Sequence, residues 1–384
     1  NAYFCAKCCE ICRAALTFSC AFIIIVGEYF VNLTIVAFPR FLGERFGLFR
    51  SVEIINSQLI GTGACLPDFV LTNAMLEHMV DTNDEWIVQR TGVRERRIAK
   101  NMHTWELALG AAQDALADAK IDAGELDLIL VSTCTPDTNT PNTAAILQDK
   151  LGAGAIGAFD INNACTGFVS ATDIADCYIK SGKARTVLVV SAETLSRIVD
   201  YTDRKTCPIF GDGAAAVLLE PDEEGYGVID HILHSDGTGA PHLYMKAGGS
   251  RYPASEETIR NNWHTITQDG QAVFKAAVSN MADVSVEMME RYNLTSDDIR
   301  YLVPHQANLR IIDATANRMG LTRNKCMINI DRYGNTTAAT IPLCLYDYEK
   351  ELKRGDKLIL ASFGGGYTWG SVYVKWAYDG ESAK

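Results

Sequence analysis

The sequence has 384 residues, of which 48% are hydrophobic and 21% are charged, and this balance is typical of a globular protein with a large buried core. The formal net charge of −12 argues against broad binding to nucleic acid or to anionic membranes, and leaves room only for a local basic patch facing an acidic partner. Of the twelve cysteines, five lie in the first twenty residues and the others are scattered without paired spacing, which indicates a reducing, cytoplasmic compartment.

The first 53 residues differ in character from the rest. Residues 14–38 are mostly apolar, and the run Ala21-Phe-Ile-Ile-Ile-Val26 resembles the core of a signal peptide or a short membrane span. An Ala-x-Ala-like cleavage site is missing, so we expect residues 1–53 to be a leader or translated upstream sequence outside the working fold, with a membrane anchor as the alternative. The cysteines of residues 5–12 have CxxC spacing twice, but no loop separates the pairs to wrap a metal, so we expect no metal site there.

From about Ile54 the sequence alternates between strand-like and helix-like segments, which predicts an α/β fold. Residues 128–133 and 186–191 are short apolar runs of the kind buried in a covered sheet, and residues 105–119 have the spacing of a helix capped by Thr104. The glycine-rich turn at Phe210 is repeated at Phe363, each followed by a strand-like run. We therefore predict two similar halves, residues 54–225 and 226–384, packed as one unit.

Cys165 lies between a strand-like stretch and a helix predicted from about Phe168 to Lys180. At a helix N-terminus, the dipole and the free N–H groups favour a thiolate, so this position suits a nucleophile that needs no metal. A packed structural thiol is the equally weighted alternative for this stretch alone.

His305 follows the strand-like run Tyr301-Leu-Val-Pro, at the edge of a sheet where ligands bind in α/β folds, and precedes a helix predicted over residues 307–319. Asn335 lies in a loop that opens another helix, where its simple role would be that of an N-cap. Together with Cys165, an imidazole and a carboxamide can donate hydrogen bonds to an oxygen that gains charge during covalent catalysis. The turn Gly364-Gly365-Gly366 adds backbone N–H groups for a second oxyanion hole.

Papain-like proteases share the order Cys, His, Asn, and the 140-residue separation of Cys165 and His305 falls within their range. Their Cys-Gly-(Ser/Ala)-Cys-(Trp/Tyr) signature is absent here, because Cys165 follows Asn-Asn-Ala and lies far from the start of the chain. We therefore reject a protease.

Six segments in order resemble the β-ketoacyl-acyl carrier protein synthase III family of the thiolase superfamily, from about Ile54 to Trp376. They are Thr82-Asn-Asp-Glu-Trp-Ile-Val-Gln-Arg-Thr-Gly-Val-Arg-Glu-Arg-Arg, Ala164-Cys-Thr-Gly-Phe, Phe210-Gly-Asp-Gly-Ala, Val303-Pro-His-Gln-Ala-Asn-Leu-Arg, Tyr333-Gly-Asn-Thr-Thr-Ala-Ala and Phe363-Gly-Gly-Gly-Tyr-Thr-Trp-Gly. The resemblance implies a homodimer with a duplicated, layered αβαβα fold. It also implies that Cys165 is acylated by an acyl-CoA, and that His305 and Asn335 stabilise the enolate formed by decarboxylation of malonyl-acyl carrier protein. No cofactor or metal is implied, since the CoA thioester is a substrate.

The resemblance also assigns binding residues. Trp86 and Arg204 would sandwich the adenine of CoA, Arg90 would contact a phosphate and Asn308 would join the polar network, while Cys165 and Gly365 would supply oxyanion N–H groups. We expect the other arginines of this segment, Arg94, Arg96 and Arg97, to be solvated.

The acidic carrier protein would dock on a basic patch that includes Lys275, Gln306, Arg310 and Arg318, weakened by Asn317 at one matched position. Thr140 aligns with the aromatic gate of the acyl pocket, so a smaller residue there predicts starters longer than acetyl, or branched.

Two enzyme alternatives and one binding alternative remain. Chalcone-synthase-like enzymes share the trio but lack the Asp-Glu-Trp-Ile segment, and a synthase of a specialised polyketide or lipid pathway fits the same residues. The binding alternative is a catalytically silent relative, but such a protein would not need Cys165, His305 and Asn335 to be intact.

Overall fold

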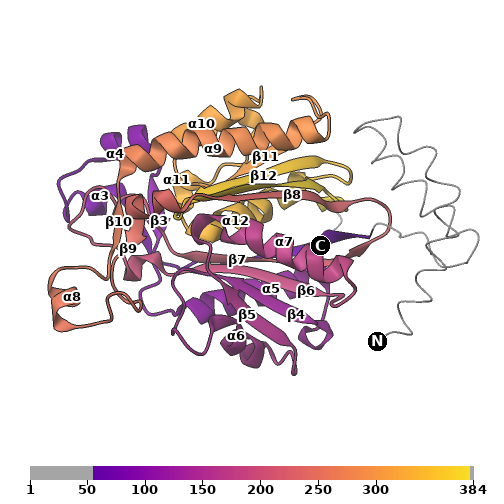
Figure 1. Ribbon diagram of the computed structural model, residues 1–384, viewed down its shortest axis with the longest axis horizontal. Coiled ribbons are helices and arrows are strands. Elements are labelled where there is room, and N and C mark those ends of the chain that lie inside the picture. The colour runs from indigo at the N-terminus through magenta and orange to yellow at the C-terminus, as the bar shows by residue number, and fades with distance from the viewer. Residues whose placement is uncertain (1–54, 381–384) are drawn as a thin grey trace, which may run out of the picture. The chain divides into compact units, whose positions relative to one another are not determined.

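The computed structural model describes residues 55–380, and nine strands of this part of the chain form one mixed sheet in the order β11-β12-β13-β8-β1-β7-β6-β4-β5 (Figure 1). The expected leader, the alternative anchor at residues 14–38 and the CxxC run at residues 5–12 all lie outside the described residues. The strands are β1 Asn56–Cys65, β4 Leu128–Ser132, β5 Gly157–Ile161, β6 Val187–Glu193, β7 Gly213–Asp222, β8 Gly227–Ser235, β11 Tyr301–Pro304, β12 Lys357–Gly364 and β13 Thr368–Lys375.

The sheet repeats one pattern of pairing. In the first half, β4 runs parallel to β6, and β6, β7 and β1 are successively antiparallel. In the second half, β11 runs parallel to β12, and β12, β13 and β8 follow in the same antiparallel order. The two series meet where β1 pairs with β8 through Ser57 and Val228. The repeated order is that of a duplicated fold, as the paired glycine turns of the sequence predict.

Helices form the outer layers and a middle layer. Helices α5 and α6 pack on strands of the first half, α9 packs on β12 and β13 of the second half with α10 against it, and α7 and α12 lie between the two sets of strands (Figure 1). Their bounds are α5 Thr104–Ala119, α6 Thr143–Leu151, α7 Gly167–Lys180, α9 Gly270–Arg291, α10 Leu309–Arg318 and α12 Thr340–Tyr348. Shorter elements are β2 Val70–Thr72, β3 Glu95–Arg97, β9 Leu243–Met245, β10 Ile266–Gln268, α3 Asn73–Leu76, α4 Asp84–Thr91, α8 Glu256–Arg260 and α11 Ile330–Tyr333.

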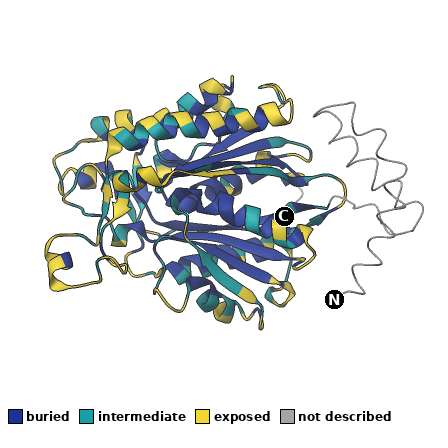
Figure 2. Ribbon diagram, viewed as in Figure 1, coloured by how far each residue is buried: buried dark blue, intermediate teal, exposed yellow. Residues whose placement is uncertain are grey.

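The middle layer is the most deeply buried part of the fold. Phe168 and Val169 of α7 and Ile341 of α12 belong to one apolar cluster with residues of β4, β6, β12 and β13, and all three are at most 1% exposed (Figure 2). Burial on every side explains why these strands read as continuous apolar runs instead of alternating ones. Both turns that lead into the middle helices are thereby held rigidly.

Two local predictions are wrong. Thr104 is not the cap of α5: it is the first helical residue, and its hydroxyl donates to the Thr135 carbonyl, while His103 and Glu106 form the capping box. Arg96 is not solvated: it is fully buried, and its guanidinium donates to the carbonyls of Leu71 and Pro208. Burial lowers the pKa of Arg96 to about 10, and carbonyl partners replace the water that this side chain loses.

No helix among the described residues is long and apolar enough to cross a membrane.

Candidate active site

Cys165 lies in a short 3-10 helix, Ala164–Thr166, between the end of β5 and the start of α7. Ala164 has a φ of 44°, in the left-handed region that side chains rarely adopt, so the chain turns sharply just before the cysteine. The Cys165 carbonyl accepts a hydrogen bond of 2.7 Å from the Ser362 hydroxyl on β12. Strands from both halves therefore fix this turn, and the thiol is 7% exposed.

The glycine turn after β12 comes close to the thiol. A Cβ added at Gly364 would lie 2.9 Å from both Cβ and the backbone nitrogen of Cys165, so only glycine fits there. Burial raises the pKa of the Cys165 thiol to about 12, the charge of Glu193 adds to the rise, and the N–H groups of Cys165 and Gly365 lower it only in part. Desolvation therefore opposes the thiolate that the N–H groups at the helix start favour, and the role of Cys165 as a nucleophile stays a prediction.

His305 follows β11, and its backbone N–H donates to the Ala361 carbonyl at 2.8 Å. Its Nδ1 lies 2.7 Å from the Thr340 hydroxyl at the start of α12, which leaves Nε2 as the ring nitrogen for other contacts. Burial lowers the pKa of His305 to about 3, since the side chain is 1% exposed. The imidazole is therefore neutral near pH 7, in keeping with a role that needs no change of charge.

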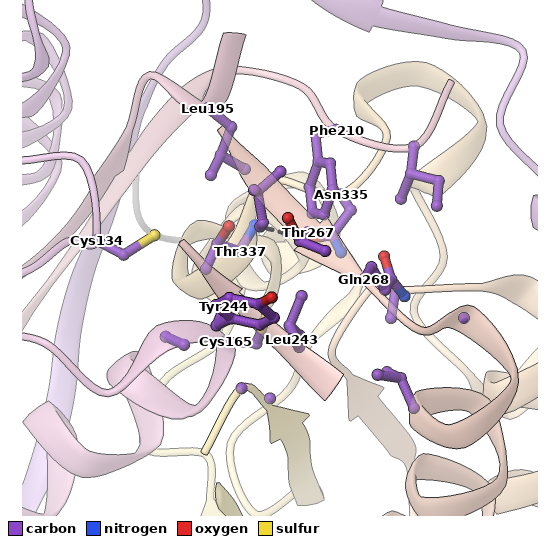
Figure 3. Close-up of a pocket in the computed structure, with 18 of the residues that line it drawn as sticks. Cys134, Cys165, Leu195, Phe210, Leu243, Tyr244, Thr267, Gln268, Asn335 and Thr337 are labelled. Carbon is purple, nitrogen blue, oxygen red and sulfur yellow. Dashed lines mark hydrogen bonds between the residues drawn. The ribbon is translucent and has the colours of Figure 1, made fainter. Parts of the chain in front are cut away.

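Asn335 is held by its backbone and by its own amide. Its N–H donates to the Ile209 carbonyl at 2.9 Å, and its carbonyl accepts the N–H of Gly211 at 3.1 Å. The side-chain oxygen accepts the backbone N–H of Thr337 at 2.8 Å, a bond drawn in Figure 3. Because Oδ1 is occupied in this way, the amide presents its Nδ2 donor away from the turn.

These side chains share one cavity of about 1340 Å³. Its lining includes Cys165, His305, Asn335 and Gly365, which come from four separate segments of the chain. A nucleophile, a neutral imidazole, a carboxamide and backbone N–H groups thus meet as the sequence predicts. This set can bind a carbonyl carbon covalently and stabilise a neighbouring oxyanion.

The predicted CoA residues line the same cavity. The guanidinium carbons of Arg204 and Arg90 lie 4.6 Å and 5.3 Å from the centre of the Trp86 ring. Asn308 also lines the cavity: its amide donates to the Arg90 carbonyl at 2.8 Å, and its oxygen caps α10. Asn308 therefore ties α4 to α10, which fixes the segment that carries Trp86 and Arg90.

The predicted carrier-protein residues divide into two groups. Lys275, Arg310 and Arg318 are exposed, and Arg310 lines the cavity, although Arg318 forms an ion pair of 2.7 Å with Asp283. Gln306 is fully buried: its amide donates to the carbonyls of Pro304 and Met327, and its oxygen accepts the N–H of Asn329. Its assignment to a docking surface is wrong, because no group of Gln306 is left to contact a partner.

Thr140 is exposed on the loop between β4 and α6, and the cavity lining includes its neighbour Asn139 but not Thr140. Its role as an acyl-pocket gate stays a prediction.

Sequence reasoning missed several polar residues around the trio. Cys134 and Thr337 line the cavity, Thr340 contacts His305, and Glu193 is buried behind Cys134. The sequence does hold a signal for Glu193: a charged residue ends a buried apolar strand. Ligands bind at the carboxyl ends of such strands, and His305 directly follows its own strand. In residues 55–380, no three His, Cys, Asp or Glu side chains are grouped closely enough to hold a metal ion.

A duplicated five-layer α/β fold with Cys, His and Asn on one cavity defines a condensing enzyme of the thiolase superfamily. Residues 159–237 match the family model described as 3-oxoacyl-[acyl-carrier-protein (ACP)] synthase III, and residues 289–376 match the model of its C-terminal part.

Individual relatives agree. The chain is 52% identical over 332 residues to the β-ketoacyl-[acyl-carrier-protein] synthase III of Porphyromonas gingivalis W83, covering 86% of this chain and 99% of the relative. It is 51% identical over 328 residues to the enzyme of that name from Chlorobium luteolum, covering 84% of this chain and all of the relative. The crystal structure of 3-oxoacyl-[acyl-carrier-protein] synthase III from Aquifex aeolicus has a TM-score of 0.78 and 42% identity, covering 83% of this chain and all of that one. The chain belongs to the 3-oxoacyl-ACP synthase III family.

Proposed function

We propose that this enzyme starts fatty-acid synthesis by two half-reactions at Cys165. In the first, the Cys165 sulfur attacks the carbonyl of an acyl-CoA, the bond to the CoA sulfur breaks, and the thiol proton passes to the departing CoA. In the second, malonyl-ACP loses CO₂, its enolate carbon attacks the acyl-Cys165 carbonyl, the bond to the Cys165 sulfur breaks, and the released thiolate takes up a proton. The products are 3-oxoacyl-ACP and free Cys165.

The meeting of Cys165, His305, Asn335 and Gly365 on one cavity is the observation that carries this proposal. His305 Nε2 and Asn335 Nδ2 are donors for the enolate oxygen, and both are neutral groups held by other hydrogen bonds. The N–H groups of Cys165 and Gly365 serve the oxyanion on the acyl carbon. Burial of all three side chains keeps water from protonating the enolate.

Residues in and around the cavity support the choice of substrates. Trp86 and Arg204 suit the adenine of CoA and Arg90 its phosphates, while Lys275 and Arg310 suit the acidic carrier protein. No cofactor takes part in either step. For the starter we keep acyl groups longer than acetyl, or branched, and a strict preference for acetyl-CoA over longer acyl-CoAs in turnover would refute that choice.

We also propose a homodimer that works in the cytoplasm. Among residues 55–380, strand β5 ends the sheet and pairs only with β4, and its other edge suits pairing with a second copy. All seven cysteines of residues 55–380 are free, which suits a reducing compartment.

Intact-mass measurement after mixing the protein with acyl-CoAs, without malonyl-ACP, tests the first half-reaction. We expect an acyl adduct that Cys165→Ala abolishes and that Cys177→Ala retains, because Cys177 is exposed and does not line the cavity. If no acyl-CoA gives an adduct, or if the adduct survives in Cys165→Ala, the proposal is wrong.

A further inference from the structure

Glu193 is a buried carboxyl group for which neither half-reaction has a use. It is the last residue of β6, and it is fully buried. It lies at the carboxyl end of this strand, the same end of the sheet at which β5 leads to Cys165. None of the ion pairs among residues 55–380 includes it. A buried carboxylate without a cation is costly, so its hydrogen bonds must account for its presence.

Those hydrogen bonds all come from one turn. The backbone N–H of Cys134 lies 3.1 Å and 3.2 Å from the two carboxyl oxygens. The Thr135 hydroxyl donates at 2.6 Å, the Cys134 thiol at 3.3 Å and the Thr133 hydroxyl at 3.4 Å. Three consecutive residues after β4 are thus fastened to one side chain, and Cys134 is the one that lines the cavity.

The same turn leads to the Asn335 segment. Cys134 and Thr337 both line the cavity, and in Figure 3 the Cys134 sulfur points toward Thr337. Thr337 in turn donates its backbone N–H to the side-chain oxygen of Asn335. Glu193 therefore supports the wall of the cavity that carries one of the proposed enolate donors.

Glu193 also acts on Cys165 through its charge. Burial raises the pKa of Glu193 to about 7, so the carboxyl group changes its charge near neutral pH. Its negative form adds to the raised pKa of Cys165 and of Cys134. Protonated Glu193 leaves Cys165 easier to ionise than ionised Glu193 does.

We propose that Glu193 is a positioning residue of this site: its carboxyl group holds the Thr133–Thr135 turn, and with it Cys134, against the cavity that Cys165 also lines. The charge of the same carboxyl group then acts on Cys165. The inference rests on the proposed role of Cys165. A residue needed only for folding would hold the turn without moving the pH dependence of the cysteine.

Glu193→Gln tests the charge, because glutamine keeps the shape and can still accept from Cys134. The measurement is the rate of Cys165 alkylation by iodoacetamide from pH 6 to pH 8, followed by mass spectrometry of the Cys165 peptide. Below the pKa of a thiol, its thiolate fraction rises about tenfold per pH unit. We therefore expect a rise of about 100-fold in Glu193→Gln, and a smaller rise in the unchanged protein, where Glu193 ionises within this range.

Glu349→Gln is the matched control. Burial also raises the pKa of Glu349 to about 7, but neither Glu349 nor its partners Thr62 and Tyr378 line the cavity. We expect its alkylation profile to equal that of the unchanged protein. If Glu193→Gln gives that profile too, the charge does not act on Cys165 and the inference fails.

Glu193→Ala tests the positioning. Without the Glu193 carboxyl group, the ratio of kcat/KM between the best and the worst of a series of acyl-CoAs is expected to fall at least several-fold. Glu193→Gln is expected to keep this ratio. An unchanged preference in a folded Glu193→Ala protein overturns the positioning, and if this variant does not fold, the alkylation profile of Glu193→Gln decides. Alkylation needs no acyl-CoA, so the proposed acyl transfer can fail in the mass experiment while this result stands or falls separately.

Discussion

Replacing Thr340 by valine removes the hydroxyl that holds His305 while keeping the shape of the side chain. That hydroxyl lies 2.7 Å from Nδ1 of His305 and 3.0 Å from the Thr337 carbonyl. The Thr337 carbonyl already accepts the backbone N–H of Thr340, so it does not depend on the hydroxyl. The hydroxyl has one proton, which goes either to that carbonyl or to Nδ1, and the proposed role of His305 requires it on Nδ1, so that the ring proton stays on Nε2 as a donor to the enolate oxygen.

The size of the effect follows from burial. Thr340 and His305 are each 1% exposed, so Nδ1 loses its partner without gaining water. Leaving such a group unpaired costs about 1–3 kcal/mol. If the whole cost falls on the transition state for decarboxylation, the rate falls by roughly 5- to 150-fold. Thr340→Ser restores the hydroxyl and is expected to recover most of the rate.

The assay measures the two half-reactions separately. Release of CO₂ from malonyl-ACP should slow in Thr340→Val, while the rate of acyl-adduct formation on Cys165 stays unchanged, because Thr340 contacts His305 and not the thiol. Equal slowing of both half-reactions would indicate general damage to the fold. Unchanged CO₂ release in Thr340→Val would refute the reasoning about the ring proton.

Four further outcomes are expected. Gly364→Ala should abolish acyl-adduct formation on Cys165, read by intact mass, because the added Cβ would lie 2.9 Å from the cysteine, and adduct formation at the normal rate would contradict the close approach. Trp86→Ala should raise KM for acyl-CoA about tenfold with little change in kcat, since it removes binding shared by ground and transition states. Arg310→Ala should weaken carrier-protein binding more than Arg318→Ala does, because Arg318 already pairs with Asp283, and added salt should reduce the loss. Equal losses of affinity in the two variants would contradict the effect of Asp283. Because the folded-state pKa of Glu193 is about 7 and its ordinary value is 4.5, Glu193 should lower the unfolding free energy by up to about 3 kcal/mol between those pH values, and denaturant titrations of Glu193→Gln should lack this share while the similar share of Glu349 stays.

Much of the fold was predictable because its signals are local. The buried strands at residues 128–132 and 301–304 read as short apolar runs, and α7 begins at Gly167, one residue before its predicted start. Cys165, His305 and Asn335 were found because each sits where a turn opens a helix, and such turns have recognisable residues.

The errors share another cause. Arg96 and Gln306 have polar side chains that usually face solvent, and both are fully buried because backbone carbonyls from distant segments satisfy them. Those partners depend on tertiary packing, which periodicity along the chain does not reveal. The burial of Cys165 was hidden for a similar reason: the helix start is visible in the sequence, whereas the desolvation that raises the pKa of the thiol follows from tertiary packing.

The stacking of Arg204 on Trp86 has a consequence for the proposed binding of CoA. In the proposed sandwich the adenine enters between the indole and a guanidinium whose carbon lies 4.6 Å from the ring centre, so the base gains two stacked partners at the loss of the contact between Trp86 and Arg204. The same contact re-forms as the nucleotide leaves. In the proposed two-step reaction, CoA must leave before the carrier protein can deliver malonate. Because Arg204 stacks on Trp86 again when the nucleotide is gone, the free site is stabilised, which favours fast release of CoA over tight binding.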